Sequence, residues 1–138
     1  MIKLSKMSDH ALVVSLQLAK DPSAKRSAGD WAQRSGLPEA TVSKLLKQMC
    51  AAGIAMSVRG KMGGYGLAKD PADVSILAIV EAIDGPVALT ECSSKSTGCG
   101  HAGSCGVKPH VNKIEVAMRE SLRAITIKEM AQGESHGK

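Results

Sequence analysis

The stretch that decides the fold is SAGDWAQRSGLPEATVSKLLKQM, which runs from Ser27 to Met49. Ser27 and Asp30 stand at the S-x-x-D spacing of a helix start. Gly36 then marks a turn before a second helix, which opens at Pro38. Apolar residues recur along one face of that second helix, at Val42, Leu45, Leu46 and Met49. Two short helices joined by a tight glycine turn predict a helix-turn-helix.

The other face of the second helix is polar and basic, with Thr41, Ser43, Lys44 and Lys47. A hairpin is predicted directly after this helix, because residues 54–58 alternate as a strand and residues 65–68 fit a return strand. The glycine-rich connection between the strands carries Arg59 and Lys61. A basic hairpin in this position is a wing, and we expect the basic side chains of the helix and the wing to contact DNA.

Helices are predicted on both sides of this region. The first helix is predicted to begin at Ser8 or Asp9 and to end before Pro22, and a fourth helix is predicted to be capped by Asp73. A longer C-terminal helix carries a narrow apolar stripe, made of Val111, Ile114, Met118, Leu122 and Ile125. Such a stripe suits a seam between two helices. The predicted fold is therefore mostly α: a winged helix-turn-helix with a two-stranded wing, plus a long C-terminal dimerisation helix.

The chain has 138 residues, which suits one compact domain per subunit. We divide it into a DNA-binding region at 1–70 and a second region at 71–138, which holds a cysteine loop (about 91–110) and the dimerisation helix. Residues 1–70 contain eleven Lys and Arg against five Asp and Glu, whereas residues 71–138 contain seven against eight. A basic first half favours an anionic partner, most simply double-stranded DNA. No apolar run is long enough to span a membrane, and we expect a cytoplasmic protein whose thiols stay reduced.

The loop contains three cysteines, Cys92, Cys99 and Cys105, spaced as C-x6-C-x5-C among glycine and serine. Packing requires no cysteine in such a loop, so the pattern indicates a metal or redox site. The fourth cysteine, Cys50, lies on the second helix of the helix-turn-helix, where we interpret it as a small buried apolar residue.

The chain resembles the bacterial winged-helix regulators of the IscR/NsrR type, which bind iron–sulfur clusters, and above all the regulators of the SUF cluster-assembly system. The resemblance rests on KLSKMSDHALVV, GLPEATVSKLLKQM, SVRGKMGGYGLAK, EAIDGPVALTEC and the three cysteines. It implies a homodimer that places one recognition helix per subunit in the major groove of promoter DNA. It also implies that Arg59 reaches the minor groove, where a guanidinium can read groove width. A 2Fe–2S cluster is the implied cofactor, with 4Fe–4S as the alternative.

Three cysteines leave one position of such a cluster without a ligand. The IscR-like pattern has a histidine three residues after the third cysteine. Lys108 stands there in this chain, and its ammonium group has no lone pair to donate. The remaining candidates in the chain are His101, His110, Asp9 and His10, and a thiol, water or small-molecule ligand is the alternative to them. The acid near the N-terminus enters this set because NsrR-like members use one.

The predicted function is an iron–sulfur-sensing transcriptional regulator, controlling SUF-type cluster-assembly genes. Three alternatives remain open: a nitric-oxide- or iron-responsive repressor of the same fold, a zinc-stabilised DNA-binding module, and an electron carrier or enzyme that uses the cluster. The basic winged half argues against the last of these. The sequence also lacks a Ser/His/Asp or paired-carboxylate arrangement for catalysis, so we do not expect an enzyme.

Overall fold

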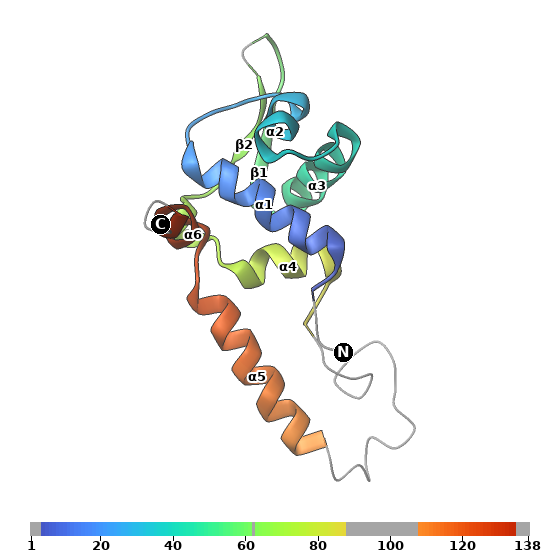
Figure 1. Cartoon of the computed structure of the whole chain (residues 1–138), viewed down its shortest axis with the longest axis vertical. Coiled ribbons are helices and arrows are strands. Elements are labelled where there is room, and N and C mark those ends of the chain that lie inside the picture. The colour runs from blue at the N-terminus through green and yellow to red at the C-terminus, as the bar shows by residue number, and fades with distance from the viewer. Residues whose placement is uncertain (1–3, 62, 88–107, 135–138) are drawn as a thin grey trace.

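The computed structural model describes residues 4–61, 63–87 and 108–134 of the chain (Figure 1). Its elements are, in chain order, α1 (Lys6–Lys20), α2 (Ala28–Ser35), α3 (Glu39–Ala51), β1 (Ala55–Val58), β2 (Gly64–Leu67), the short 3-10 helix η1 (Pro71–Asp73), α4 (Ile76–Asp84), α5 (Lys108–Ala124) and α6 (Ile127–Glu134). The two strands pair antiparallel, with Val58 opposite Gly64 beside the turn. The predicted fold class, mostly α with a two-stranded wing and a long C-terminal helix, is confirmed.

The core lies around α1, which packs against α2, α3, α4 and α6. Fully buried side chains come from all five of these helices: Val14, Leu18, Trp31, Val42, Leu45, Leu46, Met49, Ile79 and Ile127. Each aliphatic side chain of this size contributes roughly 1.5–3 kcal/mol when it is fully removed from water. The apolar stripe predicted on α3 is thus the face that joins the helix-turn-helix to the rest of the protein.

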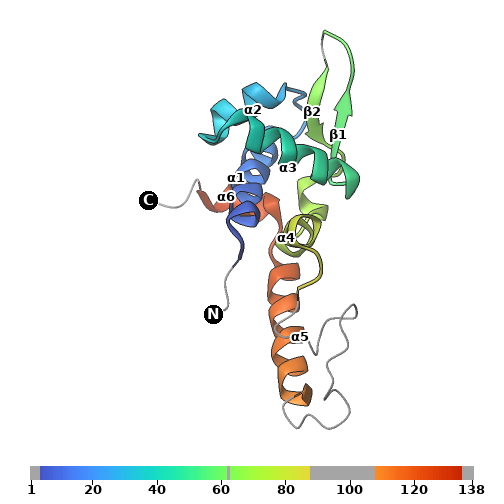
Figure 2. The same cartoon turned by 90° about the vertical axis from the view of Figure 1, so that its right-hand side faces the viewer.

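The wing and α5 lie at opposite ends of the long axis of the molecule, with the helical core between them (Figures 1 and 2). The helix α5 packs against α4 and extends away from the core. The chain then returns to the core through α6. Backbone hydrogen bonds from Ile76 to Ile125 (2.9 Å) and from Ile127 to Val74 (2.9 Å) fix this return. A change near α5 can therefore reach the core through α4 or through the start of α6.

The predicted start of the first helix was wrong. The cap is Ser5, whose hydroxyl oxygen accepts the Ser8 backbone N–H at 3.0 Å, and the helix begins at Lys6. Ser8 has a capping side chain too, but it is fully buried and donates to Asp84 instead. The contact with a distant residue decides which of the two serines caps the helix.

The predicted cap of the fourth helix was also wrong. Asp73 belongs to η1, where the side chain of Asp70 caps the turn. Ser75 caps α4 and accepts the Ala78 backbone N–H at 3.1 Å. Two consecutive turns with similar capping residues lie in this stretch, and the sequence did not separate them.

Candidate DNA interface and metal ligands

The helix α3 turns an open polar face away from the core. Lys44 and Lys47 are exposed on it, and Thr41 and Ser43 are partly exposed. The apolar side of the same helix, which includes Leu45 and Leu46, is completely buried. This division leaves the predicted DNA-contacting side chains free to meet a groove of DNA while the opposite side anchors them.

The turn between α2 and α3 sets how this face is presented. Ser27 caps α2, as predicted, by accepting the Asp30 backbone N–H at 3.1 Å. Gly36 ends α2 with φ 71°, a conformation that glycine adopts without strain. Its N–H donates to the Ala32 carbonyl at 2.9 Å, and the Leu37 N–H donates to the same oxygen at 3.2 Å. The turn is thus a standard helix end, fixed by local hydrogen bonds.

The wing presents Arg59 and Lys61 on its exposed turn. Neither of these side chains forms an ion pair with the described residues, and the same is true of Lys44 and Lys47 on α3. Four cations therefore remain available to phosphate groups. Charges of this kind supply the sequence-independent part of DNA affinity.

The base of the wing is held by a contact that the sequence did not predict. The backbones of Arg26 and Tyr65 exchange two hydrogen bonds, at 3.0 and 2.6 Å, so the linker before α2 pairs with β2. The indole N–H of Trp31 donates to the Tyr65 carbonyl oxygen at 2.8 Å. This carbonyl oxygen thus receives bonds from both sides, and the wing is fixed against α2.

Two glycines make this close approach possible. A Cβ on Gly64 would collide with the Arg26 backbone, and one on Gly66 would collide with the Ala24 carbonyl oxygen. The side chain of Arg26 has partners within the chain. Its guanidinium forms an ion pair with Asp21 at 2.6 Å and lies 5.6 Å from the centre of the Trp31 ring. The chain has a single Trp and a single Tyr, and both take part in this contact. Their rarity is the one feature of the sequence that could have indicated it.

The predicted metal ligands fall largely outside the described residues. Cys92, Cys99, Cys105 and His101 all lie there. Among the described residues, no group of three or more His, Cys, Asp or Glu side chains is arranged to hold a metal ion. The structure therefore places only the other three candidates, which are Asp9, His10 and His110.

Those three candidates lie near the starts of two helices, α1 and α5. Asp9 is exposed near the start of α1 and makes no side-chain bond within the described part of the chain. His10, beside it, is half-buried, and its Nδ1 atom is buried without a hydrogen-bond partner there. His110 is exposed in the first turn of α5. All three keep a nitrogen or oxygen atom for which the described residues supply no partner, as a ligand requires.

Cys50 is a free thiol near the end of α3, partly buried against the core. Burial raises the pKa of this thiol above its ordinary value, because desolvation disfavours the thiolate. The raised pKa fits the predicted role of a small apolar side chain and opposes one in metal binding, which requires the thiolate.

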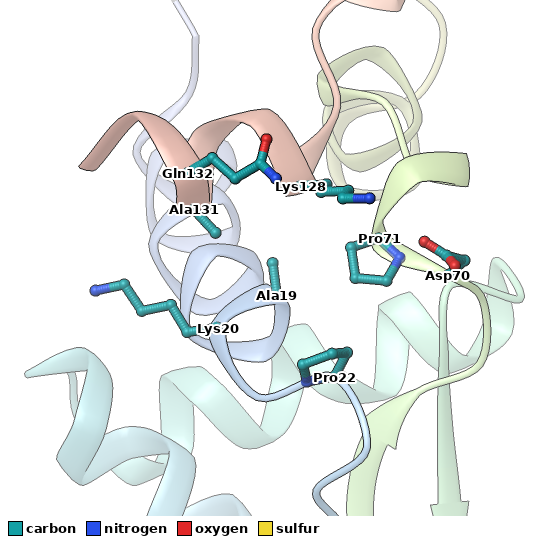
Figure 3. Close-up of a pocket in the computed structure, with 8 residues that line it drawn as sticks. All are labelled: Ala19, Lys20, Pro22, Asp70, Pro71, Lys128, Ala131 and Gln132. Carbon is teal, nitrogen blue, oxygen red and sulfur yellow. The ribbon is translucent and has the colours of Figure 1, made fainter. Parts of the chain in front are cut away.

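A groove of about 530 Å³ lies between the end of α1, η1 and α6 (Figure 3). Its lining residues are Ala19, Lys20, Pro22, Asp70, Pro71, Lys128, Ala131 and Gln132. None of the candidate ligands or DNA-contacting residues is among them. Within the described residues, the groove therefore shares no residue with either predicted site.

Comparison with known proteins places this geometry in a family. Residues 4–133 match the model of the Rrf2 family, described as iron-dependent transcriptional regulators. The chain belongs to the Rrf2 family. An rrf2-like HTH-type transcriptional regulator of Rhodobacter capsulatus is 31% identical over 130 residues, covering 88% of this chain and 87% of the relative. The HTH-type transcriptional regulator NsrR of Geobacillus kaustophilus is 31% identical over 124 residues, covering 89% and 80%.

A solved structure agrees with the fold. IscR from T. potens superposes with a TM-score of 0.77 at 24% identity, covering 99% of this chain and 91% of that one. At the level of the family, the predicted resemblance to IscR/NsrR-type winged-helix regulators is confirmed. The prediction of a non-enzymatic protein is also confirmed, since the relatives are named as transcriptional regulators. Among the described residues, no helix is both long and apolar enough to cross a membrane.

Proposed function

We propose that this Rrf2 protein is a cytoplasmic, homodimeric regulator that senses an iron–sulfur cluster and controls SUF-type cluster-assembly genes. The observation that carries the proposal is the C-x6-C-x5-C motif in a chain whose winged helix-turn-helix keeps its cations exposed. In this proposal the thiols hold the cluster that senses the signal, and the basic face binds the DNA. Both belong to one small chain, so a change at the first can alter binding at the second.

On the DNA side, α3 lies in the major groove of promoter DNA. Thr41, Ser43, Lys44 and Lys47 form its contact face, and the exposed cations there neutralise phosphates. Arg59 and Lys61 extend from the wing toward the minor groove. The Arg26–Tyr65 pairing supports this role of Arg59, because it fixes the direction of the wing relative to α2.

Binding experiments with promoter DNA test this interface. We expect Arg59→Ala to weaken specific binding about tenfold or more, and Lys47→Ala to weaken all DNA binding and lower the salt dependence by about one phosphate contact. Arg123→Gln is the matched control, because Arg123 is an exposed cation on α5. Equal losses in Arg59→Ala and Arg123→Gln would count against a role of the wing.

The cluster is held by Cys92, Cys99 and Cys105, and the fourth ligand is one of Asp9, His10, His101 or His110. The donor set fits the group, since thiolates are the usual ligands of iron–sulfur clusters and carboxylate or imidazole can complete the set. The Nδ1 of His10 and the carboxylate of Asp9 have no hydrogen-bond partner in the described part of the chain, which supports the N-terminal candidates. A 2Fe–2S cluster, when bound, supplies a group that responds to oxidants and to iron supply.

Anaerobic purification tests the cluster directly. We expect visible absorption and stoichiometric iron and sulfide in the wild type, and loss of both in Cys99→Ala. Cys50→Ala is the matched control, because its thiol has a raised pKa and lies on α3. A colourless anaerobic protein that contains zinc would overturn the proposal, as would unchanged absorption in Cys99→Ala.

A further inference from the structure

The last turn of α4 carries two carboxylates, Glu81 and Asp84, that contact the start of α1, the helix α5 and the chain just after α4. The Asp84 carboxylate accepts one hydrogen bond at each oxygen, from the Ser5 hydroxyl at 2.8 Å and from the Ser8 hydroxyl at 2.7 Å. The Ser5 hydroxyl oxygen in turn accepts the Ser8 backbone N–H and caps α1. Asp84 therefore fixes the first turn of α1, which holds Asp9 and directly precedes His10.

Glu81 makes the corresponding contacts on the other side. Its Oε2 atom accepts a hydrogen bond from the Arg119 guanidinium of α5 at 2.6 Å, and a longer one from the Val87 backbone N–H at 3.4 Å. Val87 is the last described residue before residues 88–107. One carboxylate thus holds both α5 and the chain that leaves α4.

These contacts are directional, whereas the apolar core around them is not. Glu81 and Arg119 are each nearly three-quarters buried, at 28% and 29% side-chain exposure, so water screens their ion pair only in part. The hydroxyl of the completely buried Ser8 has the Asp84 carboxylate as its partner. A rigid-body shift of α4 would break or lengthen these bonds while the aliphatic contacts slide. The hydrogen bonds and the ion pair at the end of α4 therefore respond to the position of α4 more sharply than the apolar core does.

We propose that Glu81 and Asp84 are positioning residues, which transmit the state of the segment after α4 to α1 and α5 and so determine how far the cluster changes DNA affinity. The inference rests on the proposed function. It assigns a role to part of the EAIDGPVALTEC motif that neither the DNA interface nor the cluster ligands account for. Neither residue belongs to the DNA-contacting residues or the cluster ligands proposed above.

The test compares promoter affinity with and without the cluster in full-length protein. The wild type, Glu81→Gln and Asp84→Asn are compared. For each protein, the larger of the two dissociation constants (with or without the cluster) is divided by the smaller, and iron content and melting temperature are measured as well. We expect both variants to load iron and to lower the ratio at least fivefold, in the usual range of coupling between sites. Glu120→Gln is the matched control. Glu120 also forms an ion pair, with Arg123, but that pair is exposed and lies within α5, so it joins no two elements. We expect this variant to keep the wild-type ratio.

A purely structural role would lower the melting temperature or weaken binding in both states equally, and would leave the ratio unchanged. That result, with a wild-type ratio well above one, overturns this inference and leaves the proposed function intact. A wild-type ratio of one overturns the proposed function and this inference together. If Glu81→Gln does not fold, Arg119→Met removes the same ion pair from the side of α5, and the ratio in that variant decides.

Discussion

The wing end and the α5 end of the molecule are built differently. At the wing end, the backbones of Arg26 and Tyr65 pair beside the completely buried Trp31. Glycines allow these backbones to come close together. At the other end, α5 packs against α4, while Ile114 is 52% exposed. The end proposed to match the fixed geometry of DNA is preset by backbone contacts. The end proposed to receive a partner subunit keeps apolar surface uncovered.

The strongest test of this difference is removal of the ring that anchors the wing. Trp31→Ala leaves a large cavity beside the linker and abolishes the indole bond to the Tyr65 carbonyl oxygen. We expect a loss of about 3–5 kcal/mol of unfolding free energy. Trp31→Phe keeps most of the apolar volume and should cost clearly less. Urea unfolding followed by circular dichroism measures both, and equal, small losses would show that the wing end is no more tightly fixed than α5.

A second test separates close approach from backbone strain. Gly60 and Gly64 both have positive φ, 109° and 143°, but a Cβ on Gly60 meets open space whereas one on Gly64 meets the Arg26 backbone. We expect Gly60→Ala to cost only the strain of an unusual backbone conformation, about 1–3 kcal/mol. Gly64→Ala should cost about 1–3 kcal/mol more, because it also displaces two backbone hydrogen bonds.

Promoter binding should follow the same order, because only Gly64→Ala frees the wing from α2. If Gly60→Ala weakens binding and unfolding as much as Gly64→Ala does, the turn and not the base controls the wing. The comparison between the two ends would then lose its main support.

The two ends also differ in how well the sequence predicted them. The α2–α3 region follows from local rules, because Ser27 caps, Gly36 ends a helix and Pro38 opens the next one. The contact of Trp31 with Tyr65 joins residues that are 34 positions apart, and no local pattern encodes it. The same holds for Ser8, whose partner Asp84 lies 76 positions away. The wrong start of α1 and the missed wing base have this common cause.

The candidate ligands divide in a similar way. Spacing alone predicts that Cys92, Cys99 and Cys105 form a set, and this stays a prediction because they lie outside the described residues. Choosing the fourth ligand needs distances between Asp9, His10 or His110 and that set. A spacing rule cannot supply such distances, because these residues belong to helices whose positions the tertiary contacts determine.

A third test concerns the partly exposed apolar stripe of α5 and the proposed homodimer. Ile114→Glu places a charge on a surface that the single subunit does not bury, so we expect the unfolding free energy of the dilute subunit to change by no more than about 0.5 kcal/mol. Sedimentation should show a monomer at concentrations where the wild type is a dimer. Asn112→Glu, an exposed position on another side of α5, is the control and should remain dimeric. A dimeric Ile114→Glu variant would remove α5 from the interface.

The smallest expected effect concerns Cys50, near the end of α3. Because burial raises the pKa of its thiol, the native state holds the proton more tightly than the unfolded state does. The resulting contribution to stability is fully present below the unfolded pKa and is lost as pH rises through the folded pKa. The difference in unfolding free energy between the wild type and Cys50→Ala should therefore shift against the wild type at alkaline pH. At neutral pH, iodoacetamide should modify Cys50 more slowly than it modifies glutathione. Equally fast modification would mean that the end of α3 opens readily, and that the DNA-binding end is less rigid than its backbone contacts imply.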